Sequence, residues 1–134
     1  QRVAPRLDRI VTVSRAAAEG IAADFGVARE RLQVVANGVD LDEFHPLDDR
    51  PRLPGRLIST ISANAPLKGL PVLLDALAAV RRRRPEVTLT IIGRDGHPAT
   101  TARIAALGLS EAVRFTGRLT LREMVEEYAA ASLA

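Results

Sequence analysis

The chain holds one lysine, Lys68, among nineteen basic residues, within the stretch ISANAPLKGLP at residues 61–71. Lysine offers a compact charge and arginine a planar fork, so the two bind anions in different geometries. Lys68 comes just before a predicted helix, and a helix N-terminus attracts phosphate through its unpaired N–H groups and its partial positive charge. Lys68 is therefore a candidate phosphate ligand, although spacing alone favours a solvated loop lysine.

Two glycine-containing loops are further candidates for ligand contact. The stretch IIGRDGHP includes Gly93 and Arg94, and the stretch FTGRLT includes Gly117 and Arg118. Glycine lets a backbone approach a ligand closely, but it also forms tight turns after strands, which is the simpler interpretation. None of these loops contains the G-x-x-x-x-G-K-[ST] or G-x-G-x-x-G phosphate motif.

The elements that position these loops alternate along the chain. Apolar, β-branched runs predict strands, and apolar stripes at i, i+3, i+4 and i+7 predict helices. Ser14 is a predicted N-cap, and Thr120 with Glu123 forms a T-x-x-E capping box. The predicted strands are residues 9–13, 32–36, 56–62, 87–92 and 112–117. The predicted helices are residues 15–25, a helix with Pro71 in its first turn that ends in the arginine run before Pro85, residues 99–107, and a last helix from Leu121 onward.

This alternation predicts the α/β class, in which a parallel sheet carries helices on its faces. Ligands of such sheets bind beyond the carboxyl ends of the strands. The loops 63–69, 93–98 and 116–120 all lie at that edge, so they are the loops in which a ligand site is expected. Glu123, Glu126 and Glu127 on the last helix are expected to face solvent.

Composition excludes several classes of site. The chain has no Cys, which excludes disulfides, and it has only two His, far apart in sequence, which argues against a zinc site. No apolar run approaches the roughly 20 residues that span a bilayer. Aromatic residues are 3% of the chain and do not interleave with basic ones, which argues against nucleic-acid binding. We expect a soluble, cytoplasmic protein.

The densest charge run is RRRR at residues 81–84, where a predicted helix ends. Basic residues at a helix C-terminus complement the helix dipole, so a solvated helix end is the favoured interpretation. An anionic partner such as a membrane surface is the alternative.

Four stretches in series carry a resemblance to a known family. VVANGVDLDEFHP, LKGLPVLLDAL, LTIIGRDG and VRFTGRLTLREMVEEYAAA resemble, in order and spacing, motifs of glycosyltransferase family 4, whose members have the GT-B fold. Together they cover nearly the whole chain from Ile10 onward. TVSRAAAEGI resembles the last part of the family's first domain.

The resemblance implies an internal fragment of a longer enzyme with incomplete Rossmann-like sheets. Residues 1–45 would end the acceptor-side domain, 46–55 would be the linker, and 56–134 would begin the donor-binding domain. The family moves a sugar from a nucleotide-diphosphate sugar to an acceptor with retention and without an essential metal or other cofactor. The paired catalytic glutamates and the catalytic histidine of the family lie outside the matched stretches, so we expect no catalytic residue in this chain and no activity from it alone.

The resemblance also implies site residues, position by position. The hinge is implied at Asn37 and Gly38, and the donor site is implied at Lys68, Gly69, Asn64, Gly93, Arg94, Gly117, Arg118 and Leu119. The family's G-R-x-x-x-x-K-G loop has Ser62 and Ala63 at its Gly-Arg positions, so the diphosphate-binding arginine is missing.

Three functions remain open on these grounds. They are a retaining glycosyltransferase, a non-catalytic GT-B-like protein that binds nucleotide sugar or acts as a scaffold, and a related sugar epimerase. The implied partners are a nucleotide sugar and a sugar, lipid or small-molecule acceptor, with peripheral contact to the cytoplasmic face of a membrane as a further expectation.

Overall fold

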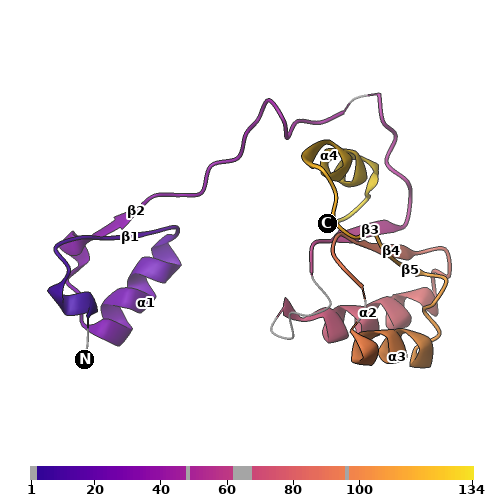
Figure 1. Cartoon of the computed structure of the whole chain (residues 1–134), viewed down its shortest axis with the longest axis horizontal. Coiled ribbons are helices and arrows are strands. Elements are labelled where there is room, and N and C mark those ends of the chain that lie inside the picture. The colour runs from indigo at the N-terminus through magenta and orange to yellow at the C-terminus, as the bar shows by residue number, and fades with distance from the viewer. Residues whose placement is uncertain (1–2, 48, 62–67, 96) are drawn as a thin grey trace. The chain divides into compact units, whose positions relative to one another are not determined.

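The computed structural model describes residues 3–47, 49–61, 68–95 and 97–134. The chain forms two compact units, Gln1–Leu41 and Asp42–Ala134, which are described separately below (Figure 1). The boundary between them lies between Leu41 and Asp42, ahead of the linker predicted at residues 46–55. The assignment of these parts to an acceptor side and a donor side stays a prediction.

The first unit is a strand–helix–strand motif. Strands β1 (Ile10–Thr12) and β2 (Leu32–Val34) pair in parallel with Ile10 opposite Leu32, and helix α1 (Arg15–Phe25) connects them. The short 3-10 helices η1 (Ala4–Arg6) and η2 (Arg29–Arg31) precede β1 and β2. Ser14 caps α1 as predicted, because its side chain accepts a hydrogen bond from the Ala17 N–H at 3.1 Å.

The second unit is a parallel sheet between two helical layers. Its strands β3 (Arg56–Ser59), β4 (Thr88–Ile91) and β5 (Val113–Phe115) are ordered β3-β4-β5. Helices α2 (Leu70–Arg81) and α3 (Pro98–Ala106) lie on one face of the sheet, and α4 (Leu121–Ala130) lies on the other (Figure 1). The predicted α/β class with parallel sheets is confirmed.

The main core lies between the sheet and the α2–α3 layer. Alternate strand residues point to this side, so Leu89 and Ile91 meet Leu74 and Leu77 of α2, and all four are at most 1% exposed. A smaller cluster of Ile58, Ile92 and Ala131 lies on the α4 side. Burying apolar area is the dominant stabilising term, so most of the stability of this unit is expected to come from the larger core.

The last residues of the chain add a strand-like segment that the sequence did not predict. The Ser132 N–H donates to the Arg56 carbonyl at 2.8 Å, and the Ile58 N–H donates to the Leu133 carbonyl at 2.9 Å. Leu57 and Leu133 form a parallel bridge. The segment therefore runs beside β3 on the edge away from β4, and the strand order reverses at β3, which is the arrangement that creates a ligand crevice in open α/β sheets.

The expectation that all three glutamates of α4 face solvent is wrong for Glu127. Its side chain is 19% exposed and pairs with both Arg56 of β3 and Arg114 of β5. Arg114 also donates to the Thr90 hydroxyl of β4 at 3.3 Å. The Glu127 carboxylate thus ties α4 to β3 and β5 through its two arginine partners, and to β4 through the contact of Arg114 with Thr90.

Candidate functional site

The candidate site lies at the carboxyl edge of the three-stranded sheet, as predicted from the strand–helix alternation. The Ile92 N–H donates to the Ser59 carbonyl at 2.8 Å, which holds the ends of β3 and β4 together. The Gly117 N–H donates to the Gly93 carbonyl at 3.0 Å, and these two glycines form an antiparallel bridge just beyond β4 and β5. The two glycine loops are therefore neighbours in space.

Arg94 and Arg118 follow the bridged glycines directly, and both side chains are exposed. The bridge therefore puts two guanidinium-bearing residues on adjoining loops at one edge of the sheet. Arginine heads offer paired donors that suit phosphate oxygens, so this edge carries positive charge suited to an anionic ligand.

Lys68 is exposed and directly precedes Gly69, which occupies the N-cap position of α2. Gly69 has a φ of 75°, a conformation that glycine adopts at little cost. It has no side chain to accept from the first-turn N–H groups of the helix. The start of α2 thus presents helix-dipole charge together with the Lys68 ammonium, which is the arrangement that binds phosphate in many proteins.

The start of α4, in contrast, is closed by its own side chains. The Glu123 N–H donates to the Thr120 hydroxyl at 3.3 Å, and the Thr120 N–H donates to the Glu123 carboxylate at 2.7 Å. This confirms the predicted capping box. The backbone N–H and then the hydroxyl of Thr120 lower the pKa of Glu123 below its ordinary value. The negative charge here makes α4 a poor anion site.

Leu119 has a structural role in addition to its predicted one. Its side chain is partly buried against the cluster of Ile58, Ile92 and Ala131. The Thr116 hydroxyl donates to the Gly117 carbonyl at 3.1 Å and stiffens the same loop. The loop that carries Gly117, Arg118 and Leu119 is thus held by the hydrogen bond of Thr116 at its start and by the packing of Leu119 at its end.

The remaining predicted residues do not join this cluster within the described structure. Asn64, the neutral substitute for the missing arginine, lies outside the described residues. Asn37 and Gly38 belong to the first unit and are exposed, and their role as a hinge stays a prediction, as do the donor-site assignments.

Sequence reasoning missed the segment after α4 that pairs with β3. Its sequence, SLA at residues 132–134, has no alternating pattern long enough to predict a strand. It pairs with β3 because its backbone lies alongside that strand, a tertiary contact across more than 70 residues of sequence.

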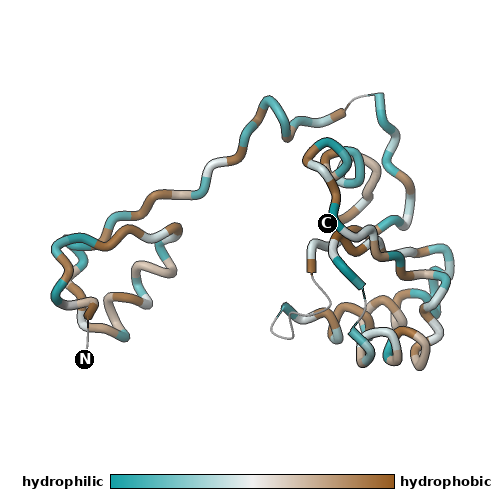
Figure 2. The backbone as a smooth tube through the Cα atoms, viewed as in Figure 1, coloured by the Kyte–Doolittle hydropathy of each residue, from teal (hydrophilic) through white to brown (hydrophobic). Residues whose placement is uncertain are grey.

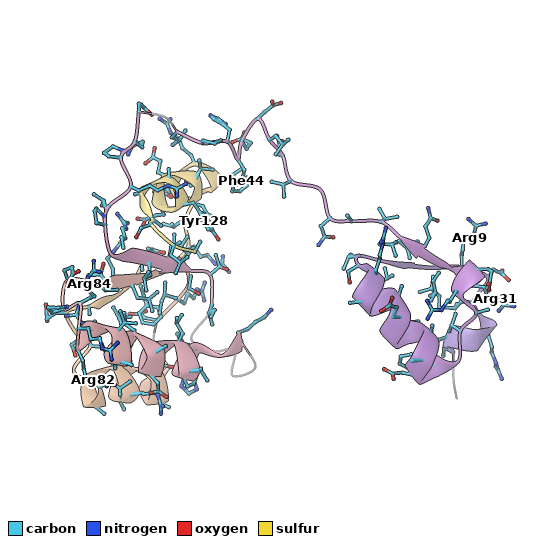
Figure 3. The ribbon with its side chains drawn as sticks, turned by 180° about the vertical axis from the view of Figure 1, so that it is seen from behind. Arg9, Arg31, Phe44, Arg82, Arg84 and Tyr128 are labelled. Carbon is cyan, nitrogen blue, oxygen red and sulfur yellow. The ribbon has the colours of Figure 1, made fainter. Side chains whose placement is uncertain are left out.

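A concave surface elsewhere in the second unit should not be confused with the site. A cavity of about 520 Å³ is lined by residues 44–47, Arg50, Arg52 and part of α4, and Figure 3 labels Phe44 and Tyr128 of its lining. It does not include the glycine loops or Lys68. Among the described residues, no group of three or more acidic or histidine side chains is arranged to hold a metal ion.

Comparison with known families matches both parts of the chain. Residues 55–134 match the model of "Glycosyl transferases group 1", and residues 1–43 match that of "Glycosyltransferase Family 4". The MMP alpha-(1->4)-mannosyltransferase of Mycolicibacterium hassiacum is 38% identical over 100% of this chain and 32% of its own length. The GDP-mannose-dependent alpha-(1-6)-phosphatidylinositol monomannoside mannosyltransferase of Mycolicibacterium smegmatis is 32% identical over 99% and 37%, respectively.

Solved structures support the same fold. Anabaena Alr3699/HepE in complex with UDP and glucose aligns with a TM-score of 0.77 and 20% identity, over 98% of this chain and 38% of that one. Sucrose-phosphate synthase of Thermosynechococcus elongatus aligns with a TM-score of 0.71 and 18% identity, over 96% of this chain and 34% of that one. At these identities the likeness concerns the fold, which is that of GT-B glycosyltransferases.

The chain belongs to the group 1 glycosyltransferases, and the resemblance found in its motifs is confirmed. It spans about a third of the length of the curated relatives described above. Among the described residues, no helix is long and apolar enough to cross a membrane.

Proposed function

We propose that the protein carrying this chain transfers a sugar from a nucleotide-diphosphate sugar to an acceptor, with retention of anomeric configuration and without an essential metal or other cofactor. The observation that carries the proposal is the convergence of the glycine loops and α2 at one edge of the sheet. The segments that follow the three strands bring basic side chains and glycine backbone to that edge. The family to which the chain belongs is defined by glycosyl transfer.

The proposed donor site divides into three regions. Lys68, Gly69 and the start of α2 bind the diphosphate, because a compact charge and helix N–H groups converge there. Gly93 and Arg94 lie towards the sugar and its phosphate. The backbone of Gly117, Arg118 and Leu119 contacts the nucleobase, with Leu119 anchored by its packing against Ile58 and Ile92.

The residues that catalyse the transfer are expected to lie outside this chain. We expect the catalytic histidine and the paired glutamates of the family in other parts of the protein, so the chain alone is expected to be inactive. Sequencing the gene beyond Ala134 tests this directly. A Glu-x7-Glu pair within about sixty codons supports transfer, and its absence there contradicts it.

For the acceptor and the cellular location, we propose only broad classes. The acceptor is a sugar, a lipid or a small molecule, and nucleic acid is not a partner. The enzyme is expected to work at the cytoplasmic side, with peripheral membrane contact. Because relatives are named as GDP-mannose-dependent and a structural neighbour contains UDP, both GDP- and UDP-sugars belong in the first donor screen.

The Lys68→Ala substitution tests the donor site. Loss of a charge-assisted contact costs about 1.5–3 kcal/mol, so donor affinity in calorimetry should fall by about 10- to 150-fold. Arg82→Ala removes the same charge from the opposite end of α2 and should leave the affinity unchanged. Equal affinity of the Lys68 variant and the native protein would refute the proposed diphosphate site.

One observation favours a second candidate, a non-catalytic nucleotide-sugar binding protein. Ala63 replaces the arginine that family members use on the diphosphate. Turnover separates the two functions: release of free nucleotide together with a glycosylated acceptor supports transfer, and binding without turnover supports the alternative. An isomerised donor would identify a sugar epimerase instead.

A further inference from the structure

The four arginines at the end of α2 differ sharply in their surroundings. The Arg81 guanidinium donates to the Val87 carbonyl, so it is used within the fold. Arg84 pairs with Glu86 at 2.6 Å, and this hydrogen bond is the main cause that raises the pKa of Arg84 and lowers that of Glu86. Arg82 and Arg83 are exposed, and no side-chain partner is found for either in the described parts of the chain. Figure 3 shows Arg82 and Arg84 at one end of the α2–α3 layer.

The outer face of α2, which leads to these arginines, is apolar. Val72 is 71% exposed and Val80 is 44% exposed, with exposed Ala76 and Ala79 between them. The tube of α2 is mostly pale to brown in Figure 2, as expected for this composition. A helix face that only contacts water normally carries polar and charged residues of both signs. The outer face of α2 instead combines exposed apolar residues with arginines that have no side-chain partner among the described residues.

The neighbouring helix does not supply opposing charge. The only acid within α2 is Asp75, and Arg103 of α3 neutralises it at 2.5 Å. The outer residues Ala102, Ala105 and Ala106 of α3 are small and uncharged. The outer face of the α2–α3 layer is therefore apolar to neutral along most of its length and positive at the end where Arg82 and Arg83 lie.

We propose that this outer face, with Arg82 and Arg83 at its end, docks the protein onto an anionic lipid surface. Unpaired arginines bind anionic headgroups electrostatically, while exposed valines bury their area at the headgroup boundary. Nucleic acid fits less well, because no aromatic side chain of this layer offers a stacking surface. The proposal does not depend on glycosyl transfer, since Lys68 lies at the opposite end of a 12-residue helix, about 18 Å away.

The test is co-sedimentation of the chain with vesicles of phosphatidylcholine alone, or of phosphatidylcholine with phosphatidylglycerol, at low and high salt. Binding is expected only to the anionic vesicles and should weaken with salt, because surface charges are screened. Each arginine near an anionic surface contributes about 5-fold in affinity, so Arg82→Gln with Arg83→Gln should lower binding by about 25-fold. Val80→Gln should lower the binding that persists at high salt.

The matched control is Arg9→Gln with Arg15→Gln, which makes the same change in net charge on the first unit, where both residues are exposed. It should leave vesicle binding unchanged, and circular dichroism should show that both double variants are folded. An equal loss in the control would mean that net charge alone drives binding, which overturns the proposal. So would equal binding to neutral vesicles, or an effect of Arg82 and Arg83 on duplex RNA binding without one on vesicles.

Discussion

At the scale of single residues, the basic side chains of this protein have different roles: some pair within the fold and others are exposed. Arg56 and Arg114 pair with Glu127 inside the fold, and Arg81 holds the Val87 carbonyl. Lys68 is exposed at the start of α2, beside a helix end that has no capping side chain. The lysine is thus one of the few cations free to meet a ligand at the carboxyl edge, which agrees with the proposed diphosphate role.

Gly69 makes a testable conformational contribution beside this lysine. Its φ of 75° lies in the left-handed region, and a Cβ placed there would meet no atom within 4 Å. Gly69→Ala should therefore destabilise the second unit through backbone strain alone, by about 1–2 kcal/mol. Urea unfolding followed on amide signals of α2 measures this change.

Gly20 in the middle of α1 provides the matched comparison. A Cβ there also meets no atom within 4 Å, but the glycine is helical. Gly20→Ala should stabilise the first unit by about 0.5–1 kcal/mol, because alanine favours helix. A Gly69 variant that is as stable as the native protein would contradict the strain argument.

At the scale of elements, α4 is held in place by two different devices. Its first turn is fixed locally by the capping box of Thr120 and Glu123. Its second half is fixed by Glu127, whose carboxylate reaches β3 and β5. The helix follows the loop of Gly117 to Leu119, so both devices also help to hold that loop at the candidate site.

Glu127→Ala should detach the second half of α4. It removes a part-buried acceptor of charged hydrogen bonds, so the free energy of unfolding should fall by about 2 kcal/mol. Glu126→Ala is the control, because Glu126 is 36% exposed and its arginine contacts are 3.5 and 3.7 Å long. Exposed pairs of this kind contribute less than about 1 kcal/mol. Equal losses for the two variants in urea unfolding would argue against the three-strand link.

The capping box predicts a dependence of stability on pH. The pKa of Glu123 is lowered by the backbone N–H and hydroxyl of Thr120, so the folded state favours the ionised carboxylate. Its contribution is complete above the ordinary pKa of a glutamate and is lost as the pH falls through the lowered, folded-state value. The stability difference between the native protein and Glu123→Gln should therefore shrink on acidification. A difference that is constant with pH in urea titrations would contradict this.

At the scale of the whole molecule, the two units differ in how much core they contain. The second unit buries β4 between two helical layers, and Leu89 and Ile91 are at most 1% exposed. The first unit has a two-stranded sheet, and α1 has no buried residue. A two-stranded sheet has little independent stability, so the first unit is expected to be the less stable one.

Hydrogen exchange measures this contrast directly. Amides of β4, such as that of Leu89, which donates to the Ala112 carbonyl at 2.8 Å, should exchange at rates set by global unfolding of the second unit. Amides of α1 should exchange much faster through local opening. Equal protection of α1 and β4 would contradict the expected difference.

Local patterns in the sequence determined much of this protein. They predicted the strand–helix order, the Ser14 cap and the Thr120–Glu123 capping box, because each depends on residues within a few positions of one another. The motifs around Lys68, Gly93 and Gly117 also indicated the family, since they occur in series at its spacing.

Tertiary structure alone decided the contacts between distant residues. The bridge between Gly93 and Gly117, the pairing of Leu133 with β3, and the ion pairs of Glu127 join residues 13 to 76 positions apart. The sequence placed Glu127 on a polar helix face and could not show that Arg56 and Arg114 point towards it from the sheet. Side-chain charge and helical period are local properties, whereas the partners of a part-buried carboxylate depend on how the strands and helices pack.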